Sequence, residues 1–170
     1  MLEIITYPDE RLKQVSDSVV SFDNELCDFI EQLEITMRQG PGGVGIAAPQ
    51  VGRFQRIAIV DVSGRKKTAN HGRLILVNPE ITHWEGYAVA REGCMSVPDF
   101  TGNVIRAEKI VLEAQNELGE SNQWSMDGFE ARAVQHEMDH LDGMLFLDRL
   151  VSRRNDLFRR KVYQQADKKF

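Results

Sequence analysis

The sequence predicts an α+β fold, in which mixed or antiparallel sheets surround one central helix. Segments with strand-like and helix-like hydrophobic patterns follow one another without the regular β-α-β rhythm of a parallel sheet. One segment, at about residues 127–143, combines an apolar stripe with a neighbouring face of reactive side chains. We expect this helix to lie in the core with the sheets around it.

The elements before the central helix follow from the spacing of apolar residues. A helix is expected from about Asp23 to Arg38, because apolar side chains recur there at helical spacing. A glycine-rich bend follows it. Short apolar or alternating runs then predict strands at residues 56–60, 74–77, 84–90 and 104–114.

The central helix has start and stop signals of its own. Asp127 and Glu130 have the spacing of a capping box, which places Asp127 at the N-cap. Gly143 follows the last apolar residue and is a natural C-terminal stop.

The reactive face of this helix has the pattern of a catalytic metal site. His136 and His140 are four residues apart and therefore point the same way, with Glu137 beside them. Two imidazoles one turn apart can bind one transition-metal ion, and the adjacent carboxylate can take a proton from water. A core helix with two hydrogen-bonded histidines is the less favoured interpretation.

A catalytic site of this type needs a third protein ligand. Cys94 lies in a glycine-flanked bend and is the favoured candidate. His71, in a predicted loop, and His83, in a predicted strand, are weaker alternatives. Cys27 lies beside the apolar stripe of the first helix and is expected to be an ordinary buried cysteine.

The glycine-rich bend has two interpretations. Gly43, Gly45 and Ala48 match a dinucleotide fingerprint, with Asp61 at a suitable distance. A helical pattern precedes these glycines, and Pro49 would stop a phosphate-binding helix at its start, so we expect no nucleotide cofactor. We expect instead that the glycines let the backbone approach a substrate, while Gln50 brings an amide to the site.

Composition limits the remaining possibilities. The chain has 170 residues, of which 42% are hydrophobic and 28% charged, as in an ordinary globular protein, and we expect one domain over residues 1–170. We expect no signal peptide and no membrane-spanning segment. The two cysteines have different contexts, so we expect no disulfide between them. We therefore expect a cytoplasmic location, where thiols stay reduced.

The net charge of −5 is unevenly distributed. Residues 149–170 contain eight Lys or Arg against two Asp, a net of +6, so the rest of the chain carries −11. We interpret this segment as a basic amphipathic C-terminal helix. It is either a solvated face or a surface that docks on an anionic partner such as ribosomal RNA.

Three motifs together resemble the peptide deformylase family. They are Gly43-Val44-Gly45-Ile46-Ala47-Ala48-Pro49-Gln50, Glu92-Gly93-Cys94-Met95-Ser96 and Gln135-His136-Glu137-Met138-Asp139-His140, in the order of that family. The resemblance extends over residues 7–148. It implies removal of the N-formyl group from the initiator methionine of newly made polypeptides.

The resemblance also implies roles for individual residues. Cys94, His136 and His140 would bind one divalent metal ion, Fe(II) by resemblance, although zinc, nickel or cobalt also suit these ligands. Glu137 would act as general base and then proton donor, and the Gln50 amide and the Met95 backbone N–H would bind the developing oxyanion. Glu92 and Arg106 would pair behind the cysteine. The expected substrate-binding residues are Val44, Gly45, Gly93, Phe129 and Ala133.

The chain departs from the family at three points. Met95 stands where the family usually has leucine, which leaves the backbone N–H in place. The family commonly has an arginine after Pro98 and a proline before Arg106, and this chain has neither. We therefore expect peptide preference, rather than reaction class, to differ.

Other functions remain open from the sequence. One is a metallopeptidase of the His-Glu-x-x-His type or a related N-acyl amide hydrolase. Another is an RNA-binding module in which the metal is structural. A requirement for Cys94 in metal binding would argue against the first alternative.

Overall fold

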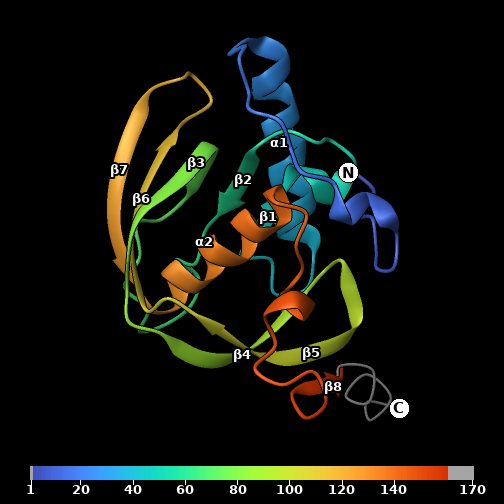
Figure 1. Cartoon of the computed structure of the whole chain (residues 1–170). Helices are drawn as coiled ribbons and strands as arrows, with labels where there is room; N and C mark the ends of the chain where they lie inside the picture. The colour runs from blue at the N-terminus through green and yellow to red at the C-terminus, as the bar shows by residue number, and fades with distance from the viewer. Residues whose placement is uncertain (1, 161–170) are drawn as a thin grey trace.

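The computed structural model describes residues 2–160, which form two antiparallel sheets and two long helices (Figure 1). The larger sheet has the strand order β1-β2-β3-β6-β7. Its strands are β1 (Gly45–Ala47), β2 (Ile57–Val60), β3 (Leu74–Glu85), β6 (Lys109–Gln115) and β7 (Ser121–Asp127). The predicted α+β class with antiparallel sheets around a central helix is confirmed.

Two helices cover opposite faces of the larger sheet. Helix α1 (Asn24–Gln39) contacts one face and α2 (Gly128–Leu141) contacts the other. Alternation along β2 explains this arrangement, because Ile57 and Ile59 pack with α1 whereas Ala58 and Val60 pack with α2. Both faces of this strand are therefore buried, as its uninterrupted apolar sequence requires.

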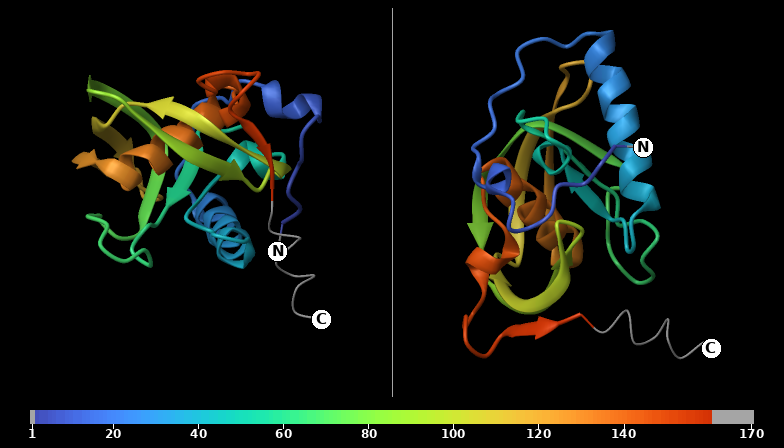
Figure 2. Two further views of the ribbon diagram at one scale, coloured as in Figure 1. Left: turned by 90° about the horizontal axis from the view of Figure 1, so that it is seen from below. Right: turned by 90° about the vertical axis from the view of Figure 1, so that its right-hand side faces the viewer.

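A smaller sheet closes the other side of α2. Its order is β4-β5-β8, from β4 (Ala88–Cys94), β5 (Val97–Arg106) and β8 (Leu157–Arg159). A third apolar cluster joins this sheet to the N-terminal segment and to the short helix η3 (Phe146–Arg149). Figure 1 shows α2 lying between the two sheets, and Figure 2 shows β8 at the edge of the smaller one.

Three predicted strands differ from the structure by more than one residue, and the one predicted at 74–77 continues to Glu85 as β3. The predicted strand at 84–90 is wrong, because residues 86–87 are irregular, with Gly86 at a φ of 64°, and connect β3 to β4 of the other sheet. The predicted strand at 104–114 is two strands that belong to different sheets. At this corner the Gln135 side chain accepts a hydrogen bond from the N–H of Ala107 and donates one to its carbonyl. The alternation of apolar and polar residues continues through this corner although the chain changes sheets there, so the sequence does not reveal the break.

The predicted C-terminal helix at 149–170 is wrong for its first part. Arg149 ends η3, and residues 157–159 form β8, which pairs antiparallel with Phe100–Gly102 of β5. These residues form a strand because the open edge of β5 offers them backbone hydrogen-bond partners. The sequence of Leu157 and Phe158 alone cannot indicate that such an edge is nearby. Residues 161–170 lie outside the described residues, so the prediction for them stays untested.

None of the described helices is both long and apolar enough to cross a membrane. The first helix begins and ends within one residue of the predicted bounds. Asp23 is its N-cap and accepts a hydrogen bond from the N–H of Leu26.

Candidate active site

Helix α2 places the three motif residues, although its start differs from prediction. Asp127 is the N-cap residue, but its side chain caps no backbone N–H. Glu130 is turned away from the cap and accepts hydrogen bonds from the N–H of His71 at 2.7 Å and from His71 Nδ1 at 2.6 Å. The predicted capping box is therefore absent, because the carboxylate of Glu130 has found partners far away in the sequence.

Cys94 reaches the helix from the end of β4. The register between β4 and β5 shifts after Gly93, so that Cys94 faces Val97 across a tight irregularity. The Cys94 Sγ lies 3.4 Å from Nε2 of His140. His71, by contrast, is held by Glu130.

The potential ligand atoms of Cys94, His136 and His140 all lie within 4.8 Å of one another. A thiolate and two imidazoles suit zinc or iron, and three protein ligands leave one position open, as in catalytic sites. All three side chains are buried or nearly so. This donor set fits one divalent transition-metal ion.

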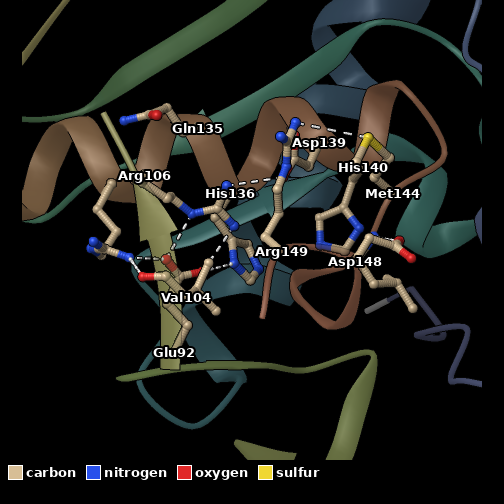
Figure 3. Close-up of polar contacts among 12 residues, drawn as sticks. Glu92, Val104, Arg106, Gln135, His136, Asp139, His140, Met144, Asp148 and Arg149 are labelled. Atoms are coloured by element: carbon tan, nitrogen blue, oxygen red, sulfur yellow. Dashed lines mark hydrogen bonds and ion pairs between the residues drawn. The ribbon is translucent and has the colours of Figure 1, made fainter. Parts of the chain in front are cut away.

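The carboxylate of Glu92 holds His136 from behind (Figure 3). Glu92 Oε1 lies 2.9 Å from Nδ1 of His136, and two guanidinium groups, of Arg106 and Arg132, bind the same carboxylate. Burial raises the pKa of Glu92, but hydrogen bonds from His136 and Arg106 outweigh it and hold the pKa well below its usual value. A carboxylate only accepts hydrogen bonds, so Nδ1 of His136 carries a proton, and a metal ion would bind at Nε2 in place of a proton there.

The network continues to the last turn of α2. Arg106 also binds Asp139 at 2.9 Å, and Arg149 binds the other oxygen of Asp139 at 3.1 Å. The predicted Glu92–Arg106 pair is thus part of a buried chain of charges. Sequence reasoning missed Arg132 and Asp139, although Arg132 lies one turn before His136 and so shares its face.

Glu137 is buried beside the three potential ligands. Among the described residues, its Oε1 is a buried oxygen without a hydrogen-bond partner. Burial raises the pKa of Glu137 to about 7, against the lowering effect of the charges on His136 and Arg106. A carboxyl group with this pKa can both take and give a proton near neutral pH.

Burial lowers the pKa of both imidazoles, but their neighbours move the two pKa values in opposite directions. It lowers the pKa of His140 well below the usual value, and the charge of His136 adds to this. Burial also lowers the pKa of His136, but the charge of Glu137 and hydrogen bonds with Cys94 and Glu92 raise it well above the usual value. Neutral His140 is therefore ready to act as a ligand.

Gln50 brings its amide to the same place from the short helix η2 (Ala48–Val51). Its Oε1 accepts a hydrogen bond from the N–H of Ala47 at 2.9 Å. Its Nε2 donates to Ser96 Oγ at 3.0 Å and lies 3.6 Å from Cys94 Sγ. These bonds fix the orientation of the amide, so its N–H₂ end points toward the cysteine.

A cavity of about 240 Å³ opens beside these groups. Gln50, Cys94, Met95, His136 and Glu137 all line it. The five predicted substrate-binding residues also line it: Val44, Gly45, Gly93, Phe129 and Ala133. The lining residues outside the predicted set include three arginines, Arg91, Arg132 and Arg160.

The fold and this site define a class of protein. A helix with the His-Glu-x-x-His pattern faces a cysteine in an antiparallel α+β fold, the arrangement of a metal-dependent hydrolase. Residues 1–156 match the family model for polypeptide deformylase. The chain belongs to the peptide deformylase family.

Individual relatives agree with this assignment. A peptide deformylase from Thermodesulfovibrio yellowstonii is 39% identical over 161 residues, covering 95% of this chain and 96% of the relative. One from Caldicellulosiruptor bescii is 43% identical over 149 residues, covering 88% and 85%. The crystal structure of a peptide deformylase from Legionella pneumophila superimposes with a TM-score of 0.82 at 37% identity, covering 90% of this chain and 88% of the other. Members of this family are metalloenzymes that remove the N-formyl group from nascent polypeptides.

Proposed function

We propose that this chain removes the N-formyl group from the methionine that begins new polypeptides, releasing formate. The observation that carries the proposal is the cluster of Cys94, His136 and His140, with buried Glu137 beside it in a cavity. Family membership supplies the substrate class. We further propose that the metal is Fe(II), by resemblance to the family, with zinc, nickel and cobalt as alternatives.

The residues divide the work of amide hydrolysis. A divalent ion held by Cys94, His136 and His140 would supply Lewis acidity, which makes water nucleophilic at neutral pH and polarises the formyl carbonyl. Glu137 takes the proton that water loses as it attacks the formyl carbon. Glu137 then gives this proton to the amide nitrogen as the C–N bond breaks, so that formate and a free amine leave.

Two donors are placed to stabilise the negative charge that develops on the formyl oxygen. The Nε2 of Gln50 is oriented by its bonds to Ala47 and Ser96. The backbone N–H of Met95 follows the cysteine and is the second proposed donor. Fixed donors of this kind stabilise the transition state because they need no reorganisation during the reaction.

The apolar part of the cavity suits a methionine side chain. Val44, Phe129 and Ala133 line the cavity, and all three also pack against or belong to the core cluster beneath α2. Phe129 and Ala133 are one helical turn apart and so present one surface. Gly45 and Gly93 leave room for the substrate backbone beside them.

The setting of the reaction is also a proposal. We infer a cytoplasmic location, supported by the substrate class and by the two free cysteines. Contact with ribosomal RNA through residues 149–170 stays a prediction, which the exposed Arg153 and Arg154 support.

Mass spectrometry of a formyl-methionyl peptide separates this proposal from the metallopeptidase alternative. We expect the metal-loaded protein to remove only the formyl group, leaving every peptide bond intact. We also expect Cys94→Ala to lose metal, whereas Cys27→Ala, a matched cysteine outside the site, keeps it. Cleavage within the peptide, or full metal binding by Cys94→Ala, would contradict the proposal.

A further inference from the structure

The face of the smaller sheet that opens on the cavity carries two arginines that the proposed mechanism does not use. In antiparallel sheets, directly paired residues point to the same face, and so do residues two apart on one strand. Arg91 pairs with Asn103, Gly93 pairs with Thr101, and Thr101 pairs with Phe158. Arg160 comes two residues after Phe158. Register thus places Arg91 and Gly93 on one face, Arg160 follows directly after β8, and all three line the catalytic cavity.

Arg160 occupies space that only a glycine leaves free. A Cβ built at Gly93 would lie 2.7 Å from Nη2 of Arg160. The same Nη2 lies 3.4 Å from the carbonyl oxygens of Cys94 and Val97, which are long hydrogen bonds. Its Nε is buried and has no hydrogen-bond partner among the described residues. A third long contact joins Nη2 to the carbonyl oxygen of Phe100 at 3.5 Å, so the guanidinium lies beside the backbone of the cysteine and is held there, within residues 2–160, by long hydrogen bonds alone.

Arg91 is held over the same face by packing. Its guanidinium lies 3.8 Å from the ring centroid of Phe158 in a cation–π contact. Its Nε donates to Asn103 at 3.1 Å, and its Nη1 approaches Thr101 Oγ1 at 3.4 Å. Strand β8 thus helps to fix both cations, since it supplies Phe158 and leads into Arg160.

The two arginines give this rim an excess of positive charge. Neither has a carboxylate within 4.0 Å among residues 2–160. The other charged pair at the cavity is already matched, because Arg132 binds Glu92 at 2.6 Å. Asp156 lies near this face and is linked to Arg91 through Asn103, so its carboxylate offsets the charge of one of the two arginines.

We propose that Arg91 and Arg160 select formylated peptides with an acidic side chain at the second or third residue. This inference rests on the proposed deformylation. With its formyl group at the proposed metal site and its methionine against Phe129, a substrate would continue past Gly93, which lines the same cavity. Arg91 and Gly93 are two residues apart on one face of a strand, a separation of about 7 Å. An extended peptide covers the same distance in about two residues, which brings the second or third residue of the substrate near Arg91. Long cationic side chains on both sides of that path attract carboxylates.

The test compares peptides that differ only in charge. The substrates are formyl-Met-Glu-Ala-amide, formyl-Met-Gln-Ala-amide and the matching pair with Glu or Gln third, with the amide removing the terminal carboxylate. We expect the metal-loaded wild type to prefer Glu over Gln in kcat/KM by about two- to fivefold at one position or both, as for exposed ion pairs. The preference should shrink at high salt.

Variants then assign the preference to the two side chains. We expect Arg91→Gln and Arg160→Gln each to reduce the Glu-to-Gln ratio toward one. Arg159→Gln is the matched control, since it removes the same charge from the neighbouring position, on the other face of β8 beside Phe100. Thermal unfolding of each variant verifies its fold, and having two variants keeps the test decisive if one of them fails to fold.

The outcomes distinguish a failure of the proposed acidic preference from a failure of the proposed deformylation. A wild-type ratio of one, or a ratio that both arginine variants leave unchanged, would overturn the inference while deformylation stands. A ratio lowered equally by Arg159→Gln would reduce it to a general charge effect and also overturn it. If neither the Glu nor the Gln peptides lose their formyl group with any metal, the proposed function fails, and the inference fails with it.

Discussion

Oε1 of Glu92 lies 2.9 Å from Nδ1 of His136, and this contact sets the direction in which the imidazole offers its other nitrogen. The partner of a metal-binding histidine fixes both the tautomer and the ring orientation. Glu92 itself is fixed by Arg106 and Arg132. The proposed metal site therefore depends on a carboxylate that would not touch the metal.

Removing this charge should weaken metal binding. We expect Glu92→Gln to bind Zn(II) or Ni(II) about 10- to 100-fold more weakly than the wild type, as measured by competition with a chelator of known affinity. Glu31→Gln, an exposed change on α1, is the control and should bind as the wild type does. Equal affinities for Glu92→Gln and wild type would show that His136 is oriented by something else.

The buried charge network should also be needed for stability. Arg106 binds both Glu92 and Asp139, and its side chain is only 3% exposed. Arg106→Ala leaves two buried carboxylates without this partner, so we expect the free energy of unfolding in denaturant to fall by about 3–5 kcal/mol. Arg153→Ala, on the surface, should change it by less than about 0.5 kcal/mol. A small loss at Arg106 would mean that Arg132 and Arg149 compensate fully.

Gln50 should act mainly on the transition state. We expect Gln50→Ala to lower kcat by about a hundredfold or more while changing KM much less, because its Nε2 is a proposed oxyanion donor. Ser96→Ala removes the hydroxyl that binds Nε2 and should cause a smaller loss. Steady-state kinetics with a formyl-methionyl peptide measures both. A rise in KM with kcat intact would instead assign Gln50 to substrate binding.

Gly45 limits the space around the proposed base. A Cβ at this position would lie 2.5 Å from Oε2 of Glu137, so Gly45→Ala must displace either the carboxylate or the strand. Displacement by about 1 Å can cost a hundredfold in rate, and we expect a loss of that order in kcat. Gly64→Ala is the control, because a Cβ there meets nothing within 4 Å. Normal activity of Gly45→Ala would contradict the proposed position of Glu137.

Local patterns in the sequence predicted the parts of the fold that depend on neighbouring residues. Helix α1, helix α2 and the common direction of His136 and His140 all follow from helical spacing. Cys94 could be singled out because a glycine-flanked thiol has few structural reasons to be there. The structure places it 3.4 Å from His140, across 46 residues of sequence.

The remaining features depend on contacts between distant segments. Glu130 does not cap α2 as predicted, because its carboxylate binds His71, 59 residues away in the sequence. Strand β8 forms because β5 has an open edge, and no periodicity in three residues can indicate that. Arg91 and Arg160 reach the cavity only through the register of this sheet. Non-local pairing of this kind overrides local propensity.

The central claim, that Glu137 performs proton transfer at a metal-dependent deformylase site, is tested most directly by formate release. The protein is purified without oxygen and loaded with Fe(II), Ni(II) or Zn(II), and the wild type and Glu137→Gln are compared on one formyl-methionyl peptide. We predict metal-dependent release by the wild type, and a fall of at least about a hundredfold in a variant that still binds metal. Equal activity of the two proteins, or no release with any metal that binds, would contradict the claim.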